Sequence, residues 1–152
     1  MCLRPVSNVK FAFYTVLLYF EEKFIFFQNK TYMHRILLIE DDDFDSFVIG
    51  DFLERNNFEV TVTENGLMGI NFAKQEKPDL ILCEINAPVL DGYEVIEALR
   101  CDASTCYIPL LFIAALDDPE SRMRAKELGV NDYLIKPIDL DELLIKVNQH
   151  LQ

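Results

Sequence analysis

Five short apolar runs alternate with segments of helical period between residue 33 and the end of the chain. The runs are RILLIE (35–40), EVTVT (59–63), DLILCEI (79–85), PLLFIAA (109–115) and DYLIK (132–136). Runs of this length with few polar interruptions are typical of strands that are buried on both faces, as in a parallel sheet. The alternation predicts an α/β fold in which a doubly wound, five-stranded parallel sheet carries helices on both faces.

The segments between these runs carry apolar residues at helical spacing, which predicts helices that face a core. In the first and last helices these residues are Phe44, Phe47, Val48 and Phe52, and Leu140, Leu143, Leu144, Val147 and Leu151. Asp139 and Glu142 have the spacing of a capping box at the start of the last helix. Gly129, after Leu128, is placed to end the fourth helix.

Residues 1–32 differ in composition from residues 33–152. They contain six of the twelve Phe and three of the six Tyr, no Gly, and a net charge of +2, whereas the remaining 120 residues carry −14. Their apolar run FAFYTVLLYF (11–20) is shorter than the about 20 residues that cross a bilayer. We expect residues 1–32 to be an N-terminal extension outside the domain, with Met33 as the true start. The alternative is a short helix that binds a membrane surface or a partner.

Charge and cysteine content narrow the class of protein. The net charge of −12 argues against nucleic acid as a direct partner, because a phosphate backbone repels an acidic surface. The four cysteines lack the C-x-x-C spacing of a zinc site, and His34 and His150 are far apart in the sequence. We therefore expect reduced thiols in a cytoplasmic protein; the alternative is a bridge between Cys101 and Cys106.

Charged residues follow several of the predicted strands at the point where each strand ends. Glu40 and Asp41 follow the first strand, Glu84 lies near the end of the third, and Lys136 ends the fifth. The carboxyl ends of parallel strands form the functional crevice of such a sheet. Three carboxylates and an ammonium predict a hard-oxygen site for a cation such as Mg²⁺, with the lysine available for a phosphoryl oxygen or an acid.

Other acidic residues of this region are interpreted differently. Asp42 and Asp43 are expected to belong to a solvated loop. Asp45 is expected either to share that role or to cap the first helix.

These motifs resemble the receiver domain of two-component response regulators. The segments ILLIEDD, PDLILCEINAPVLDGYEV, IPLLFIAALDD and GVNDYLIKPID occur in the order and spacing of that family and cover nearly everything from Met33 onward. The resemblance implies a flavodoxin-like (βα)5 fold with strand order 2-1-3-4-5.

The resemblance also implies roles for individual residues. Glu40 and Asp41 match the acidic pair around Mg²⁺, and the backbone carbonyl of Asn86 matches a further ligand. Lys136 matches the lysine that holds the phosphoryl group, and Pro137 matches a proline that often follows it after a cis bond.

The position that matches the phosphate-accepting aspartate of the family holds Glu84. A glutamate side chain is longer by one methylene, about 1.5 Å, and a misplacement of that order slows a transfer that depends on alignment. Efficient phosphorylation of Glu84 is therefore not expected. Its charge instead reaches toward the volume of a phosphoryl group, where Lys136 can meet it.

A second departure concerns the residues that transmit the signal in the family. Ala114 occupies the position of a Thr or Ser whose hydroxyl binds the phosphoryl group, and alanine cannot donate that hydrogen bond. Tyr133 matches the aromatic residue that rotates inward on activation, or is a half-buried strand tyrosine. Without the hydroxyl, the link from Glu84 to Tyr133 lacks its first connection.

The sequence thus predicts a pseudo-receiver, not an enzyme, that acts as a single-domain protein through contacts with a histidine kinase or a downstream effector. The resemblance places that contact on the fourth helix, fifth strand and fifth helix, where Arg122, Arg124, Lys126 and Glu127 lie. Neither a membrane span nor a DNA-binding domain is expected, and Mg²⁺ is expected to bind weakly.

Two alternatives remain open. The first is a working phosphorelay receiver in which a histidine kinase phosphorylates Glu84. The second is a phosphohydrolase of the phospho-aspartate type, which would use a D-x-D run such as Asp41 to Asp43.

Overall fold

The computed structural model describes residues 8–28 and 32–152. The chain divides into two compact units, Met1–Tyr32 and Met33–Gln152, at the position where the composition changes. In the first unit the described residues form one helix, α1 (Asn8–Gln28). Within the described residues no helix combines the length and the apolar character needed to cross a membrane.

The second unit alternates strands and helices along its whole length. Its elements are β1 (Arg35–Ile39), α2 (Asp43–Arg55), β2 (Glu59–Thr63), α3 (Gly66–Glu76), β3 (Leu80–Glu84), α4 (Gly92–Arg100), β4 (Leu110–Ala114), α5 (Pro119–Glu127), β5 (Asp132–Ile135) and α6 (Leu140–His150). The predicted fourth and fifth helices are therefore α5 and α6. All five predicted strands are present, and their bounds differ from the apolar runs by at most one residue at each end.

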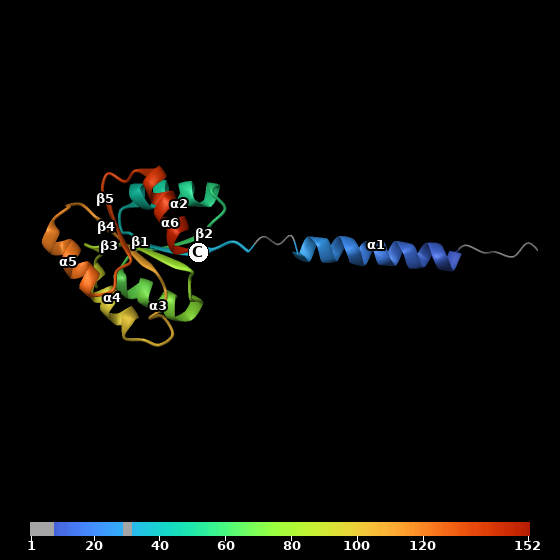
Figure 1. The fold of residues 1–152 in the computed structure, drawn as a ribbon, viewed down its shortest axis with the longest axis horizontal. Coiled ribbons are helices and arrows are strands. Elements are labelled where there is room, and N and C mark those ends of the chain that lie inside the picture. The colour runs from blue at the N-terminus through green and yellow to red at the C-terminus, as the bar shows by residue number, and fades with distance from the viewer. Residues whose placement is uncertain (1–7, 29–31) are drawn as a thin grey trace, which may run out of the picture. The chain divides into compact units, whose positions relative to one another are not determined.

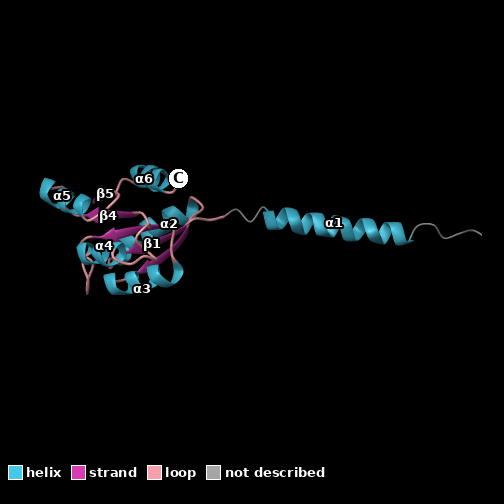
Figure 2. Ribbon diagram, turned by 60° about the horizontal axis from the view of Figure 1, so that its bottom comes forward, coloured by secondary structure: helices cyan, strands magenta, loops and turns pink. Residues whose placement is uncertain are grey.

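The strands, drawn in magenta in Figure 2, form one parallel sheet. Their order is β2-β1-β3-β4-β5. This is the predicted doubly wound fold and strand order, and both predictions are confirmed. Every residue of β3 and β4 is buried, as expected for central strands covered on both faces.

Helices cover the sheet on both faces (Figure 1). On one face α2 and α6 pack through Ile49, Leu53, Leu143 and Val147 against alternate strand residues such as Leu38 and Leu82. On the other face α3, α4 and α5 pack against the remaining alternate residues, among them Phe112 and Tyr133. The site at the strand ends thus lies between two packed layers.

The first helix of this unit faces the core with only part of its predicted stripe, because Phe52 packs against the core but Phe44 and Phe47 do not. Phe44 and Phe47 are 73% and 70% exposed, whereas Ile49 and Leu53 are 2% and 0% exposed. The prediction was wrong for the two phenylalanines because α2 carries a second apolar stripe, and that stripe packs on the sheet. In α6 the predicted stripe is confirmed, with Leu143 and Val147 fully buried.

Aspartate and asparagine side chains begin the helices of the second unit. Asp139 accepts hydrogen bonds from the N–H groups of Asp141 and Glu142 at 2.9 and 3.1 Å, which is the first half of the expected capping box. The complete reciprocal pair is found in α4, between Asp91 and Glu94.

The fourth predicted helix, α5, ends at Glu127 with Leu128 as its C-cap, and Gly129 follows at the position expected for a residue that stops the helix. Gly129 has φ of +88°, a left-handed conformation that glycine adopts without a steric penalty. The guanidinium of Arg100 donates hydrogen bonds to the carbonyls of Gly129 and Ile108 and to Oδ1 of Asn131. Arg100 therefore joins α4 to the loops that precede β4 and β5.

Cys83, Cys101 and Cys106 are free thiols in the described part of the chain, and the alternative bridge between Cys101 and Cys106 is not formed. Cys83 is completely buried in β3, and burial raises the pKa of its thiol. Cys2 lies outside the described residues.

Candidate functional site

The register of the sheet brings the ends of three strands together at its carboxyl edge. Glu40 directly follows β1, Glu84 is the last residue of β3, and Lys136 directly follows β5. β1 pairs with β3, and β4 pairs with both β3 and β5, so the three side chains emerge at one edge. The Lys136–Pro137 peptide bond is cis, the conformation that the resemblance implies.

Three carboxylates surround the Lys136 ammonium. Its Nζ lies 2.8 Å from Oε2 of Glu84, 2.9 Å from Oδ2 of Asp45 and 3.2 Å from Oε2 of Glu40. The side chains of Glu40 and Glu84 are almost completely buried, whereas those of Lys136 and Asp45 are 24% and 36% exposed. An ammonium has three N–H donors, so the number of carboxylates equals the number of donors.

The electrostatics of the site follow from burial and from these charges. Burial raises the pKa of Glu40; the N–H of Asp42, which donates to Oε1 of Glu40 at 3.1 Å, opposes this effect, and the charge of Glu84 adds to it. Burial alone would lower the pKa of Lys136, but hydrogen bonds and charge from Glu84, Asp45 and Glu40 outweigh burial, so its pKa is raised. Lys136 is therefore a firmly protonated cation.

The two other residues assigned to a metal lie at the surface of the site. Asp41 follows Glu40 and is exposed, and Asn86 is exposed in the loop between β3 and α4. Across residues 8–28 and 32–152, no three His, Cys, Asp or Glu side chains are grouped in an arrangement suited to a metal ion. The oxygens are of a type that Mg²⁺ prefers, but an ammonium stands among them.

Ala114 is the last residue of β4 and is buried. Its carbonyl accepts a hydrogen bond from the N–H of Lys136 at 2.8 Å, which joins the ends of β4 and β5. Its methyl side chain offers no hydrogen-bond donor to the crevice.

Tyr133 lies inside the domain and is 5% exposed. Its ring packs edge-on against Phe112 at 6.2 Å, and the guanidinium of Arg122 lies 4.8 Å from its centroid. Burial raises the pKa of Tyr133 to about 12. The hydroxyl oxygen is buried and finds no hydrogen-bond partner among the described residues.

The face named by the resemblance carries several exposed charges. Arg122 contacts both the Tyr133 ring and the carboxylate of Asp117, which lies in the loop after β4. Arg124 stacks on the Tyr93 ring at 3.9 Å, and Lys126 and Glu127 are exposed.

Asp45 is the member of the site that sequence reasoning missed. Asp42, not Asp45, caps α2, and its Oδ1 accepts the N–H of Asp45 at 2.8 Å. The expectation that Asp45 belongs to the solvated loop or caps the helix was therefore wrong. If Asp42 is assigned as the cap, Asp45 falls in the first turn of the helix. That assignment was the signal in the sequence that could have indicated a role for Asp45 at the crevice.

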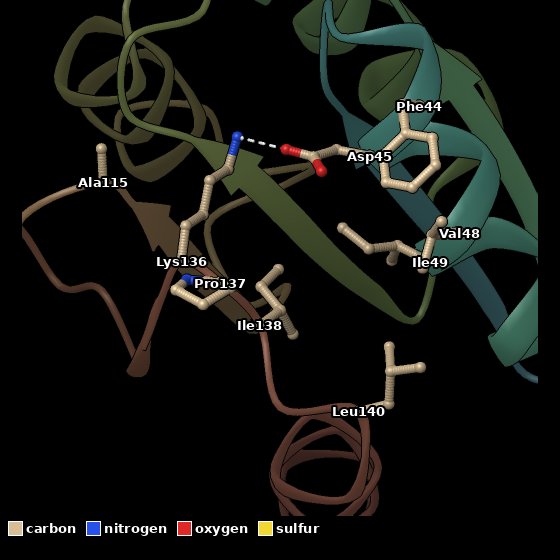
Figure 3. Close-up of a pocket in the computed structure, with 9 residues that line it drawn as sticks. All are labelled: Phe44, Asp45, Val48, Ile49, Ala115, Lys136, Pro137, Ile138 and Leu140. Carbon is tan, nitrogen blue, oxygen red and sulfur yellow. Dashed lines mark ion pairs between the residues drawn. The ribbon is translucent and has the colours of Figure 1, made fainter.

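A pocket of about 490 Å³ opens beside the ion pair of Asp45 and Lys136 (Figure 3). The two side chains point toward one another from α2 and from the end of β5. The remaining lining is mostly apolar: Phe44, Val48, Ile49, Ala115, Pro137, Ile138 and Leu140.

Known proteins similar to this chain share its second unit. The family described as the response regulator receiver domain matches residues 36–148. The protein PilH of Pseudomonas aeruginosa is 35% identical over 116 residues, which are 76% of this chain and 96% of PilH. The chain spans about half the length of several other curated relatives it matches, which are transcriptional regulators.

Solved structures similar to this chain include response regulators and receiver domains. A putative response regulator from Chloroflexus aurantiacus superposes with a TM-score of 0.75 and 28% identity, covering 78% of this chain and 98% of that one. The receiver domain of the sensor histidine kinase PA1611 from Pseudomonas aeruginosa, solved with a magnesium ion in its active site cleft, superposes with a TM-score of 0.73, the same identity and the same coverage.

Proposed function

Because the chain belongs to the response regulator receiver domain family of two-component signalling, we propose that it is a pseudo-receiver, a module that signals through protein contacts without phosphorylation of an aspartate. The observation that carries this proposal is the 2.8 Å contact between Glu84, at the acceptor position, and Lys136. The glutamate that replaces the acceptor is thereby paired with the lysine that would hold a phosphoryl group.

Two further features support the proposal. Ala114 supplies no hydroxyl to bind a phosphoryl oxygen, so a charge in the crevice lacks the usual connection to the loop after β4. Tyr133 is already buried with Arg122 over its ring. Packing against Phe112 and under Arg122 supports a buried position of this ring that does not depend on a modification at Glu84.

We assign the output contact to the surface of α5, β5 and α6, where Arg122, Lys126 and Glu127 are exposed. Its partner is a protein, either a histidine kinase or a downstream effector. Mg²⁺ would bind weakly to Glu40, Asp41, Glu84 and the Asn86 carbonyl, because Lys136 already neutralises part of this charge. When bound, the ion would offset the repulsion between the carboxylates.

Intact-mass measurement of the full chain after incubation with acetyl phosphate and Mg²⁺ tests the proposal. We expect no phosphoryl adduct on the wild type. Glu84→Asp shortens the side chain by one methylene, and Glu84→Asp combined with Ala114→Thr also restores a hydroxyl. We expect the double variant to be labelled at least about tenfold faster than the wild type, because alignment controls the transfer.

An adduct on the wild type that is lost in Glu84→Gln would contradict the proposal. The chain would then be a working phosphorelay receiver modified on Glu84. Turnover of an aryl phosphate that requires Asp41 would instead support the phosphohydrolase alternative.

A further inference from the structure

Asp45 differs from the other two carboxylates that contact Lys136. Glu40 and Glu84 lie at strand ends with side chains that are 1% and 6% exposed, whereas Asp45 belongs to the first turn of α2 and is 36% exposed. Its backbone N–H is satisfied by Asp42. The Asp45 side chain therefore contacts Lys136 from the helix side, in a position open to solvent.

This difference decides which carboxylate an incoming anion would displace. The Lys136 ammonium lies within 3.2 Å of three carboxylates, so a phosphate oxygen that contacts it competes with them. Displacing Glu40 or Glu84 would leave a buried charge without its partner, which is costly. Displacing Asp45 returns its carboxylate to water at little cost.

The surroundings of the pair leave room for a small anion. Asp45 and Lys136 both line the pocket of about 490 Å³, and the ion pair between them lies at its edge (Figure 3). The rest of the lining offers mostly apolar side chains. Lys136 is therefore the cationic group among the residues that line this pocket, and Asp45 is its partner there.

We propose that Asp45 is a specificity-determining residue: its carboxylate pairs with Lys136 in the place of an external anion and so excludes phosphate groups from the crevice. The inference rests on the proposed function, because both treat the crevice as filled by carboxylates of the chain itself. It goes beyond that function by assigning the exclusion to a helix residue that is neither the acceptor equivalent nor a strand-end acid.

The test measures binding of inorganic phosphate to the full chain by ³¹P NMR titration at constant ionic strength, without Mg²⁺. Asp45→Ala removes the competing carboxylate. Asp43→Ala is the matched control, since Asp43 is an exposed acid in the same first turn of α2. We expect Asp45→Ala to bind phosphate about tenfold more tightly than the wild type, because one close negative charge is removed. Asp43→Ala should change the affinity by less than about twofold.

A second variant identifies the binding position. In Asp45→Ala combined with Lys136→Gln, the gain in phosphate affinity should disappear. Equal gains in Asp45→Ala and Asp43→Ala would show a general charge effect and overturn the proposal, as would a gain that survives Lys136→Gln. Far-ultraviolet circular dichroism and melting temperature confirm that each variant is folded.

The two proposals fail separately. Phosphate binding forms no bond to Glu84, so a phosphoryl adduct on the wild type would overturn the pseudo-receiver while the comparison of Asp45→Ala with Asp43→Ala still applied. Equal affinities of those variants would overturn the role of Asp45 and leave the pseudo-receiver standing.

Discussion

The hydroxyl of Tyr133 is a buried polar group without a hydrogen-bond partner among residues 8–28 and 32–152. Such a group has lost its hydration and received no bond in return. Its ring, in contrast, is well packed against Phe112 and under Arg122. The aromatic ring rather than the hydroxyl therefore stabilises this position.

We expect Tyr133→Phe to raise the free energy of unfolding by about 1 kcal/mol, since it removes an unsatisfied buried group and keeps the ring. Urea denaturation measures the change. Tyr107→Phe, at a tyrosine that is 65% exposed, should leave stability unaltered. A loss of stability in Tyr133→Phe would mean that the hydroxyl forms a hydrogen bond in solution.

For individual residues, the sequence predicted some members of the site and missed another. The meeting of Glu40, Glu84 and Lys136 was predictable, because each residue lies at the carboxyl end of a strand in one parallel sheet. The contact of Asp45 was not, because a run of four aspartates within five residues leaves the capping residue undetermined. Only the backbone geometry at Asp42 fixes which carboxylate turns toward Lys136.

Among the elements, α2 shows how two apolar stripes compete for the core. Phe44 and Phe47 belong to one stripe and are exposed, whereas Ile49 and Leu53 belong to the other and are buried. Helical spacing alone fits both stripes, and the more aromatic one was predicted to face the core. The structure favours the stripe that leaves Asp45 beside Lys136.

Substitutions in α2 distinguish the two stripes. We expect Leu53→Ala to cost about 2–5 kcal/mol of unfolding free energy, because it opens a cavity in the core. Phe47→Ala, at a side chain that is 70% exposed, should cost less than about 0.5 kcal/mol. Chemical denaturation of both variants gives these values, and a larger loss from Phe47→Ala would show that α2 packs through its aromatic stripe.

At the scale of the whole molecule, charge is the dominant feature. Residues 33–152 carry −14, and acidic residues follow or begin several elements at the carboxyl edge of the sheet. Like charges at one edge oppose the compact state unless cations neutralise them. The fold and strand order could be predicted because they depend on apolar alternation, whereas a cation site depends on side-chain directions that the sequence does not specify.

We expect millimolar Mg²⁺ to raise the melting temperature of the full chain by about 2–4 °C, because a ligand that binds only the folded state stabilises it. NaCl of equal ionic strength should raise the melting temperature less. Asp41→Ala should reduce the response to Mg²⁺, and Asp43→Ala should retain it. If Mg²⁺ leaves the melting temperature of the wild type unchanged, and Asp41→Ala has a higher melting temperature than the wild type, the acids repel one another without binding the ion.

The hydrogen bonds of Arg100 make the two ends of α5 unequal. At its carboxyl end, Gly129 accepts two of these bonds, which tie the helix terminus to α4. At its amino end, beside the crevice, Arg122 reaches back to Asp117, and Ala125 is the one residue of α5 that is buried. Helix α5 is thus anchored to α4 at the end far from Lys136, whereas the end nearest the crevice is held by the exposed ion pair of Arg122 with Asp117. We expect a partner that binds Arg122 to displace that end of the helix first.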